Sequence, residues 1–258
     1  RFTNEKPEGA LQFEPGRWGC VMWLFAAAAR GRSAVADEST FGCLGGGVGL
    51  GFGNQYQNWP GGIECFNYFL TVGNKAWEHG RDMIEQVEQF MSGDALEHYV
   101  HGERYMKSPE VSAKFVENMP FFEIPTKYVL FQPLEKLEDG NDAEVVIFTV
   151  EPHQLSALTI LANYRRGTGD ATTIPWAAGC QTLGVLAFRA ARSNPPQAVV
   201  GLTDLAARRQ VAKKLGHNVM TFTIPWKMFL EMEEDVEGSF LEREEWTSLA
   251  RDGLHDDE

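Results

Sequence analysis

Residues 143–167, "AEVVIFTVEPHQLSALTILANYRRG", contain the pattern that decides the fold class. Residues 143–150 form a short run rich in β-branched and aromatic side chains, which predicts a buried strand. Residues 151–167 predict a helix, because Pro152 suits its first turn and Gly167 suits the position just past its end. A strand that leads directly into a helix indicates a sheet covered by helices.

The alternation of strands and helices continues on both sides of this stretch. Residues 8–15 are expected to be an irregular segment that leads into the helix at 18–30. We expect further strands at 33–37, 127–134, 198–203 and 218–225. We expect helices at 18–30, 76–91, 108–119, from near residue 180, from residue 204, and at 226–238. The chain is therefore predicted to be a single domain of the α/β (or α+β) class, with a mixed sheet covered by helices.

Two distant stretches share an order of features. Residues 18–42 and 176–206 each contain a Trp, a Gly-Cys pair, an apolar Ala-rich helix, an Ala-Arg pair and an Ala-Val strand. This echo suggests an internal pseudo-twofold duplication. The related halves would be a glycine- and cysteine-bearing half at 1–120 and a strand-helix half at 121–258.

Composition limits the partners and the compartment. The formal net charge of −13 disfavours nucleic acid and anionic membrane surfaces, because both attract clusters of Lys and Arg. The most apolar piece, residues 20–29, is much shorter than the roughly 20 residues that span a bilayer. With four cysteines and no recognisable signal peptide, we expect a cytoplasmic protein with reduced thiols.

Glycine dominates residues 41–54, "FGCLGGGVGLGFGN". Glycine loses more conformational entropy on folding than other residues, so this density predicts a close approach of the backbone to a cofactor or to another segment. The residues expected to contact a cofactor are Gly45, Gly46, Gly47 and Gly49. They do not form a clean G-x-G-x-x-G motif between a strand and a helix, so a dinucleotide site is disfavoured.

The four cysteines are candidate metal ligands. Cys20 and Cys180 fall at equivalent predicted helix N-termini, where the helix dipole favours the thiolate that binds metals. Cys43 lies in the glycine-rich stretch, and Cys65 is a less secure fourth ligand. Their spacing matches no standard ferredoxin motif, but a fold that gathers them would supply the soft ligands of a [4Fe–4S] cluster.

Two other readings stay open. Trp18 and Trp176 could form apolar walls for a haem or another tetrapyrrole, with one thiolate as an axial ligand. Alternatively, the protein is a non-enzymatic carrier or sensor of a small ligand, and its cysteines are buried structural residues.

The histidines and potential nucleophiles give weaker indications of a ligand, metal or catalytic site. His153 follows a predicted strand in the first turn of a helix, where it either contacts a ligand or is a simple polar residue. His98 and His101 are three residues apart, which could hold a metal, but we expect a solvated helix face. No nucleophile has an identifiable base, so no catalytic residue is assigned and enzymatic activity stays open.

Several motifs together resemble the domain-of-unknown-function 169 family, which is widespread in anaerobic prokaryotes. They include "GRWGC", "FGCLGGGVGLGFGN", "HQLSALTILANY", "VVGLTDLAAR" and "SFLEREEW", and the resemblance covers nearly the whole chain. It includes Cys20, Cys43 and Cys180, and Cys65 less securely. Leu44 departs from the pattern, because a proline is expected there.

The resemblance implies no settled activity, but anaerobic life favours an oxygen-sensitive cofactor. We therefore expect a metal- or redox-cofactor-binding protein that acts in electron transfer or cofactor handling. Its partner would be a redox protein or a small-molecule ligand, and homo-oligomerisation stays open.

Overall fold

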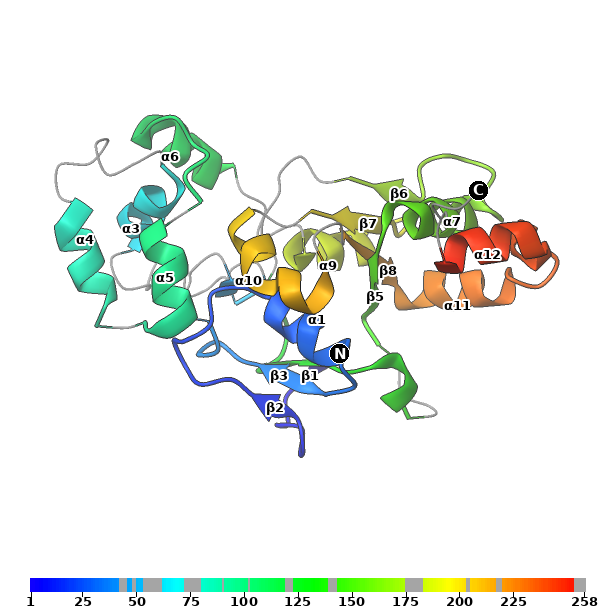
Figure 1. Ribbon diagram of the computed structural model, residues 1–258, viewed down its shortest axis with the longest axis horizontal. Helices are drawn as coiled ribbons and strands as arrows, with labels where there is room; N and C mark the ends of the chain where they lie inside the picture. Colours follow the sequence, from blue (N-terminus) through cyan, green and yellow to red (C-terminus); the bar gives the residue numbers. More distant parts are fainter. Residues whose placement is uncertain are drawn as a thin grey trace.

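The computed structural model describes residues 1–41, 46–47, 50–52, 62–71, 80–89, 91–101, 103–118, 123–138, 143–174, 183–202, 205–216 and 220–252. These residues form two four-stranded mixed sheets and the helices that cover them (Figure 1), so the predicted fold class is confirmed. In this part of the chain no helix is long and apolar enough to span a bilayer.

The first sheet has the strand order β1-β4-β3-β2. Its strands are β1 (Phe2–Thr3), β2 (Leu11–Gln12), β3 (Ala34–Ala36) and β4 (Tyr128–Phe131). Strand β4 runs antiparallel to β1 and β3, whereas β2 runs parallel to β3. Helix α1 (Met22–Ala28) connects the two parallel strands, as a parallel pair requires a crossover connection.

The second sheet has the strand order β5-β8-β7-β6. Its strands are β5 (Val145–Val150), β6 (Thr172–Thr173), β7 (Ala198–Gly201) and β8 (Met220–Pro225). Here β8 runs antiparallel to β5 and β7, and β6 runs parallel to β7. Helix α9 (Val185–Ala191) lies between β6 and β7 in the chain, and α10 (Leu205–Leu215) follows β7.

The two sheets repeat one topology in the same register. In the first sheet, a residue of β4 can pair with a residue of β1 on one side and of β3 on the other. In the second sheet, a residue of β8 can pair in the same way with β5 and β7, so three paired positions in one sheet correspond to three in the other. The matched triads are Phe2–Val129–Ala36 and Phe148–Phe222–Val200. The shared register supports the predicted duplication, and the boundary between the sheets falls between Phe131 and Val145.

The repeats differ most in the connection to their central strand. In the second repeat α10 alone is described between β7 and β8. In the first repeat the described elements between β3 and β4 include the helices α3 (Gly62–Leu70), α4 (Gly80–Val87), α5 (Gly93–His101) and α6 (Pro109–Glu117). They gather at one end of the molecule (Figure 1) and bury a hydrophobic cluster of their own. Helix α6 begins as predicted, because the Ser108 hydroxyl accepts the Val111 N–H.

One arginine joins two of these inserted helices. Arg104 has a left-handed φ of 56°, which is rare for a side-chain-bearing residue. Its Nη1 donates to the carbonyls of Tyr68 and Thr71 at the end of α3, and its carbon Cζ lies 4.4 Å from the centre of the Tyr68 ring. Its Nη2 and Nε donate to the carbonyls of Val100 and His101 at the end of α5, each at 3.1 Å. A cation at two helix C-termini complements both dipoles.

The second sheet packs one face against α7 (Pro152–Asn163) and α11 (Trp226–Glu234). Arginines just after α7 hold the end of α11: the Arg165 Nε lies 2.7 Å from Asp235 Oδ2, and its Nη2 lies 3.1 Å from Glu234 Oε2. Arg166 Nη2 lies 2.5 Å from Glu231 Oε2. Helix α12 (Glu244–Asp252) follows in the chain and packs on α7.

Some local predictions were wrong. Strand β2 lies inside residues 8–15, which were expected to be irregular. Helix α1 begins at Met22 instead of residue 18 or 19, because Trp18 is held in a parallel β-bridge with Phe41. Extended backbone at Trp18 cannot also form the first turn of a helix.

Candidate functional site

The segment before α1, which contains Cys20, is held against helix α5. The N–H of Ala95 donates to the Arg17 carbonyl at 2.7 Å, and the Trp23 Nε1–H donates to Asp94 Oδ2 at 2.8 Å. These bonds use groups at the N-terminus of α5, where backbone N–H groups lack partners within the helix. The inserted helices therefore position the segment that carries the thiol.

Glycine allows backbone segments to meet here without side chains between them. A Cβ added at Gly19 would lie 3.2 Å from the Cβ of His98 in α5, and one added at Gly46 would lie 3.0 Å from both the Gly19 carbonyl oxygen and the Phe41 ring. A Cβ at Gly47 would meet nothing within 4 Å. The close approach predicted for the glycine-rich stretch is therefore present at Gly46, and its partner is the chain itself.

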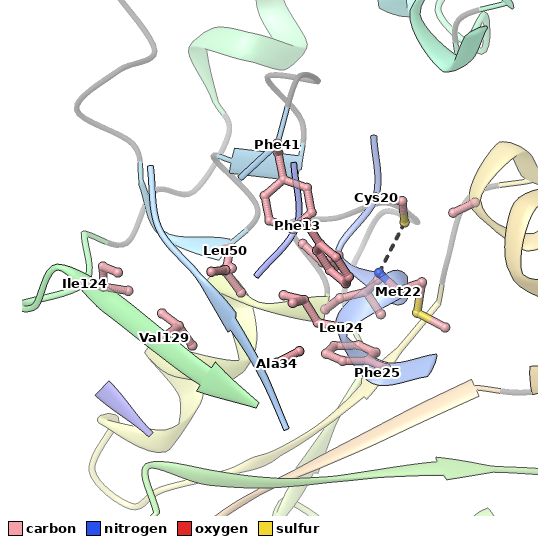
Figure 2. Close-up of a cluster of buried hydrophobic side chains, with 14 of the residues drawn as sticks. Phe13, Cys20, Met22, Leu24, Phe25, Ala34, Phe41, Leu50, Ile124 and Val129 are labelled. Atoms are coloured by element: carbon pink, nitrogen blue, oxygen red, sulfur yellow. Dashed lines mark hydrogen bonds between the residues drawn. The ribbon is translucent and has the colours of Figure 1, made fainter. Parts of the chain in front are cut away.

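Cys20 is fully buried in the core of the first repeat, with 0% of its surface exposed. Its Sγ accepts the N–H of Met22, the first residue of α1, at 3.4 Å. Figure 2 shows this bond and the side chains of the same cluster, among them Phe13, Leu24 and Leu50. Trp18 packs at the edge of this cluster, with its ring centre 5.2 Å from that of Phe13.

The segments that carry two other cysteines reach the same cluster. It contains Phe41, two residues before Cys43, and Leu183, three residues after Cys180. The structure thus brings the described neighbours of Cys43 and Cys180 into one core with Cys20. The predicted site residues Cys43, Cys180, Gly45, Gly49 and Trp176 lie outside the described residues.

Cys65 is placed less favourably. It belongs to α3, and its side chain lies outside the described part of the structure. Its neighbours Phe66 and Phe69 are buried in the cluster of the inserted helices, which is separate from the cluster that contains Cys20. The described packing gives no support to Cys65 as a fourth ligand.

His153 lies in another part of the molecule. It occupies the first turn of α7, as predicted, with its side chain 26% exposed and its Nδ1 3.8 Å from Glu151 Oε2. Helix α7 packs in the hydrophobic cluster of the second sheet, not in the cluster of Cys20. Among the described residues, His153 is therefore not brought together with Cys20.

The expectation of a solvated face at His98 and His101 was wrong for His98. Its side chain is 2% exposed and its Nε2 lies 3.3 Å from Oε1 of Glu103, which is 7% exposed. Gly19 leaves room for α5 to press His98 into the core, whereas His101 stays exposed. No sequence pattern predicts this buried pair, because the contact between His98 and Gly19 joins segments that are distant in the chain.

The described residues limit the metal chemistry that can be assigned. Among them, no group of three or more His, Cys, Asp or Glu side chains could hold a metal ion. Cys43, Cys180 and the side chain of Cys65 lie outside these residues, so a cysteine-ligated centre stays a prediction. The N–H that Met22 donates to the Cys20 sulfur suits such a centre, because hydrogen bonds to ligand sulfurs adjust cluster potentials.

Comparison with known proteins identifies a family. No match was found among curated proteins, and none among solved structures. The sequence profile of the DUF169 family, described as an uncharacterised ArCR family, matches residues 1–235. Because this match spans most of the 258 residues, the chain belongs to the DUF169 family.

Proposed function

We propose that this protein binds a cysteine-ligated iron–sulfur centre where the segments of Cys20, Cys43 and Cys180 meet. The observation that supports the proposal is the shared core cluster, which contains Cys20, Phe41 and Leu183. Cysteines far apart in the sequence can ligate one centre only if the fold gathers their segments, and the described neighbours meet this condition. Soft thiolates are the ligands that iron–sulfur clusters, zinc and Cu(I) prefer, and the iron–sulfur cluster is the one proposed for this protein.

The duplicated fold gives this proposal a geometric basis. Cys20 precedes α1 and Cys180 precedes α9, the helices that connect equivalent strands in the two sheets. Each repeat would therefore contribute one thiolate, and the connection specific to the first repeat would contribute Cys43. A bound cluster would supply a one-electron redox couple, with a potential set by hydrogen bonding and burial.

The proposed role is electron transfer or cofactor handling in the cytoplasm of an anaerobe, with a redox protein as partner. The low cysteine count and the family resemblance support this setting. Cys65 is the weakest of the four predicted ligands, because its helix is built into the other cluster.

Anaerobic purification with assays for iron and acid-labile sulfide tests the proposal. We expect broad absorbance near about 400 nm, lost on oxidation, and a paramagnetic signal after reduction. The variants Cys20→Ser, Cys43→Ser and Cys180→Ser should each lower the cluster content at least about tenfold, since even outer-shell changes cost this much.

Cys65→Ser is the matched control, because it makes the same change on α3, whose described residues Phe66 and Phe69 pack in a different cluster. It should retain most of the iron if the three-cysteine set is correct. A colourless, metal-free protein from anaerobic cells would contradict the proposal. A sharp, intense band without sulfide would favour a tetrapyrrole instead.

A further inference from the structure

A cavity of about 360 Å³ lies between the two sheets. It is lined by residues 129–135, from β4 into the 3-10 turn Leu134–Lys136, and by residues 143–149, which include most of β5. Small-molecule sites commonly have volumes of about 300–1,000 Å³. Phe25 and Phe188 of its lining belong to the cluster that contains Cys20, but Cys20 itself does not line the cavity.

Aromatic side chains form much of the cavity wall. Phe25 of α1, Phe131 of β4 and Phe188 of α9 all line it, and the ring centres of Phe25 and Phe131 are 5.3 Å apart. Ala28, which has a small side chain, also lines the cavity. Walls of this kind favour a flat aromatic ligand, because rings stack on rings at such distances.

Strand β5 presents backbone hydrogen-bonding groups to the cavity. The sheet order leaves one edge of β5 without a neighbouring strand among the described residues. The Trp226 N–H donates to the carbonyl of Glu144, the residue opposite it, so pairing with β8 uses every second residue from Glu144. The N–H and C=O groups of Val145, Ile147 and Thr149 therefore point to the open edge, and all three residues line the cavity.

Charged side chains of both signs border the cavity. Glu135, Glu144 and Arg1 line it, and Arg192 Nη2 lies 3.4 Å from Glu144 Oε2. A phosphate group binds best to clustered cations or to a helix N-terminus, and the described lining offers neither. The border therefore suits an uncharged ligand.

We propose that this cavity binds an uncharged, planar aromatic molecule that carries an amide-type N–H and C=O on one edge. The rings of Phe25, Phe131 and Phe188 contact its faces, and the edge of β5 pairs with its donor and acceptor. The proposed site adjoins the cluster that contains Cys20 and does not include Cys20 itself.

The fluorescent alloxazine lumichrome is a suitable probe, because it is uncharged and planar and has an imide edge. Titration of the anaerobically purified protein should give a Kd on the order of 10 μM, as expected for a ligand of about 18 non-hydrogen atoms. The analogue methylated at the imide nitrogen loses the donor to β5 and should bind about tenfold more weakly.

Two alanine variants test the location. Ala28→Leu fills the cavity and should weaken lumichrome binding at least about tenfold. Ala157→Leu makes the same change at a half-buried alanine of α7 that does not line the cavity, and should leave binding unchanged. Absence of binding by the unaltered protein, equal binding of the methylated analogue, or no effect of Ala28→Leu would each overturn the proposal. None of these results depends on iron or sulfide.

Discussion

The two repeats have the same sheet topology but carry different connections to their central strand. Strands β3 and β4 are joined through the glycine-rich stretch and the helices α3 to α6, whereas α10 is the helix described between β7 and β8. The inserted helices bury their own core and also hold the segment before α1 through Ala95 and Asp94.

This difference bears on where a metal site could form in a duplicated fold. The shared scaffold places Cys20 and Cys180 before equivalent helices, but a pair of thiols is a poor metal site on its own. The connection specific to the first repeat adds Cys43 and brings Gly46 against the backbone of Gly19. The connection between β3 and β4 is thus the main structural difference between the two repeats in the described part of the chain.

The largest expected effect is a difference in stability between substitutions at matched positions of the two central strands, β8 and β4. Phe222→Ala should lower the free energy of unfolding by about 3–5 kcal/mol, because it empties a fully buried position in the second sheet. Val129→Ala, at the matching position of the first sheet, should cost only about 2 kcal/mol, since fewer buried methyl groups are lost. Chemical denaturation measures both, and equal costs would contradict the assigned cores.

A smaller effect on stability is expected from substitutions in the glycine-rich stretch. Gly46→Ala should destabilise the protein by about 1–3 kcal/mol, because its Cβ would press on the Gly19 carbonyl and Phe41. Gly47→Ala adds the same methyl group one residue later in open space and should change stability by less than about 1 kcal/mol. Thermal unfolding of the pair checks this, and a reversed order would show that the described contact is not present.

The smallest effect concerns the second repeat alone and depends on pH. The hydrogen bond from Arg165 lowers the pKa of Asp235 below its ordinary value of 3.8. A carboxylate with a lowered folded-state pKa stabilises the protein above the ordinary value, and this contribution is lost as the pH falls through the lowered pKa. Asp235→Asn should therefore cost some stability at pH 7 and none in strong acid. Unfolding curves at several pH values test this, and a difference that persists at pH 2 would refute it.

Much of the fold could be predicted from the sequence. The run at 143–150 became β5, and the segment after Pro152 became α7, because a long periodic pattern with end signals leaves few alternatives. The cap at Ser108 was also predicted correctly, since capping depends on neighbouring residues only. Strands of two residues, such as β1 and β6, were not predicted, because they are too short to show periodicity.

The candidate functional site was harder to predict from the sequence than the fold. Glycine density predicted a close approach, and Gly46 makes one, but its partner Gly19 is a matter of tertiary structure. The burial of His98 has the same origin. The cavity between β4 and β5 depends on how two sheets pack against each other, and no local pattern encodes this.

The guanidinium of Arg104 couples the C-terminal ends of α3 and α5. Because one guanidinium donates hydrogen bonds to carbonyls at the ends of both α3 and α5, neither end can fray without weakening the other. The two termini should therefore open as one cooperative unit, and amide hydrogen exchange at both should proceed at matching rates.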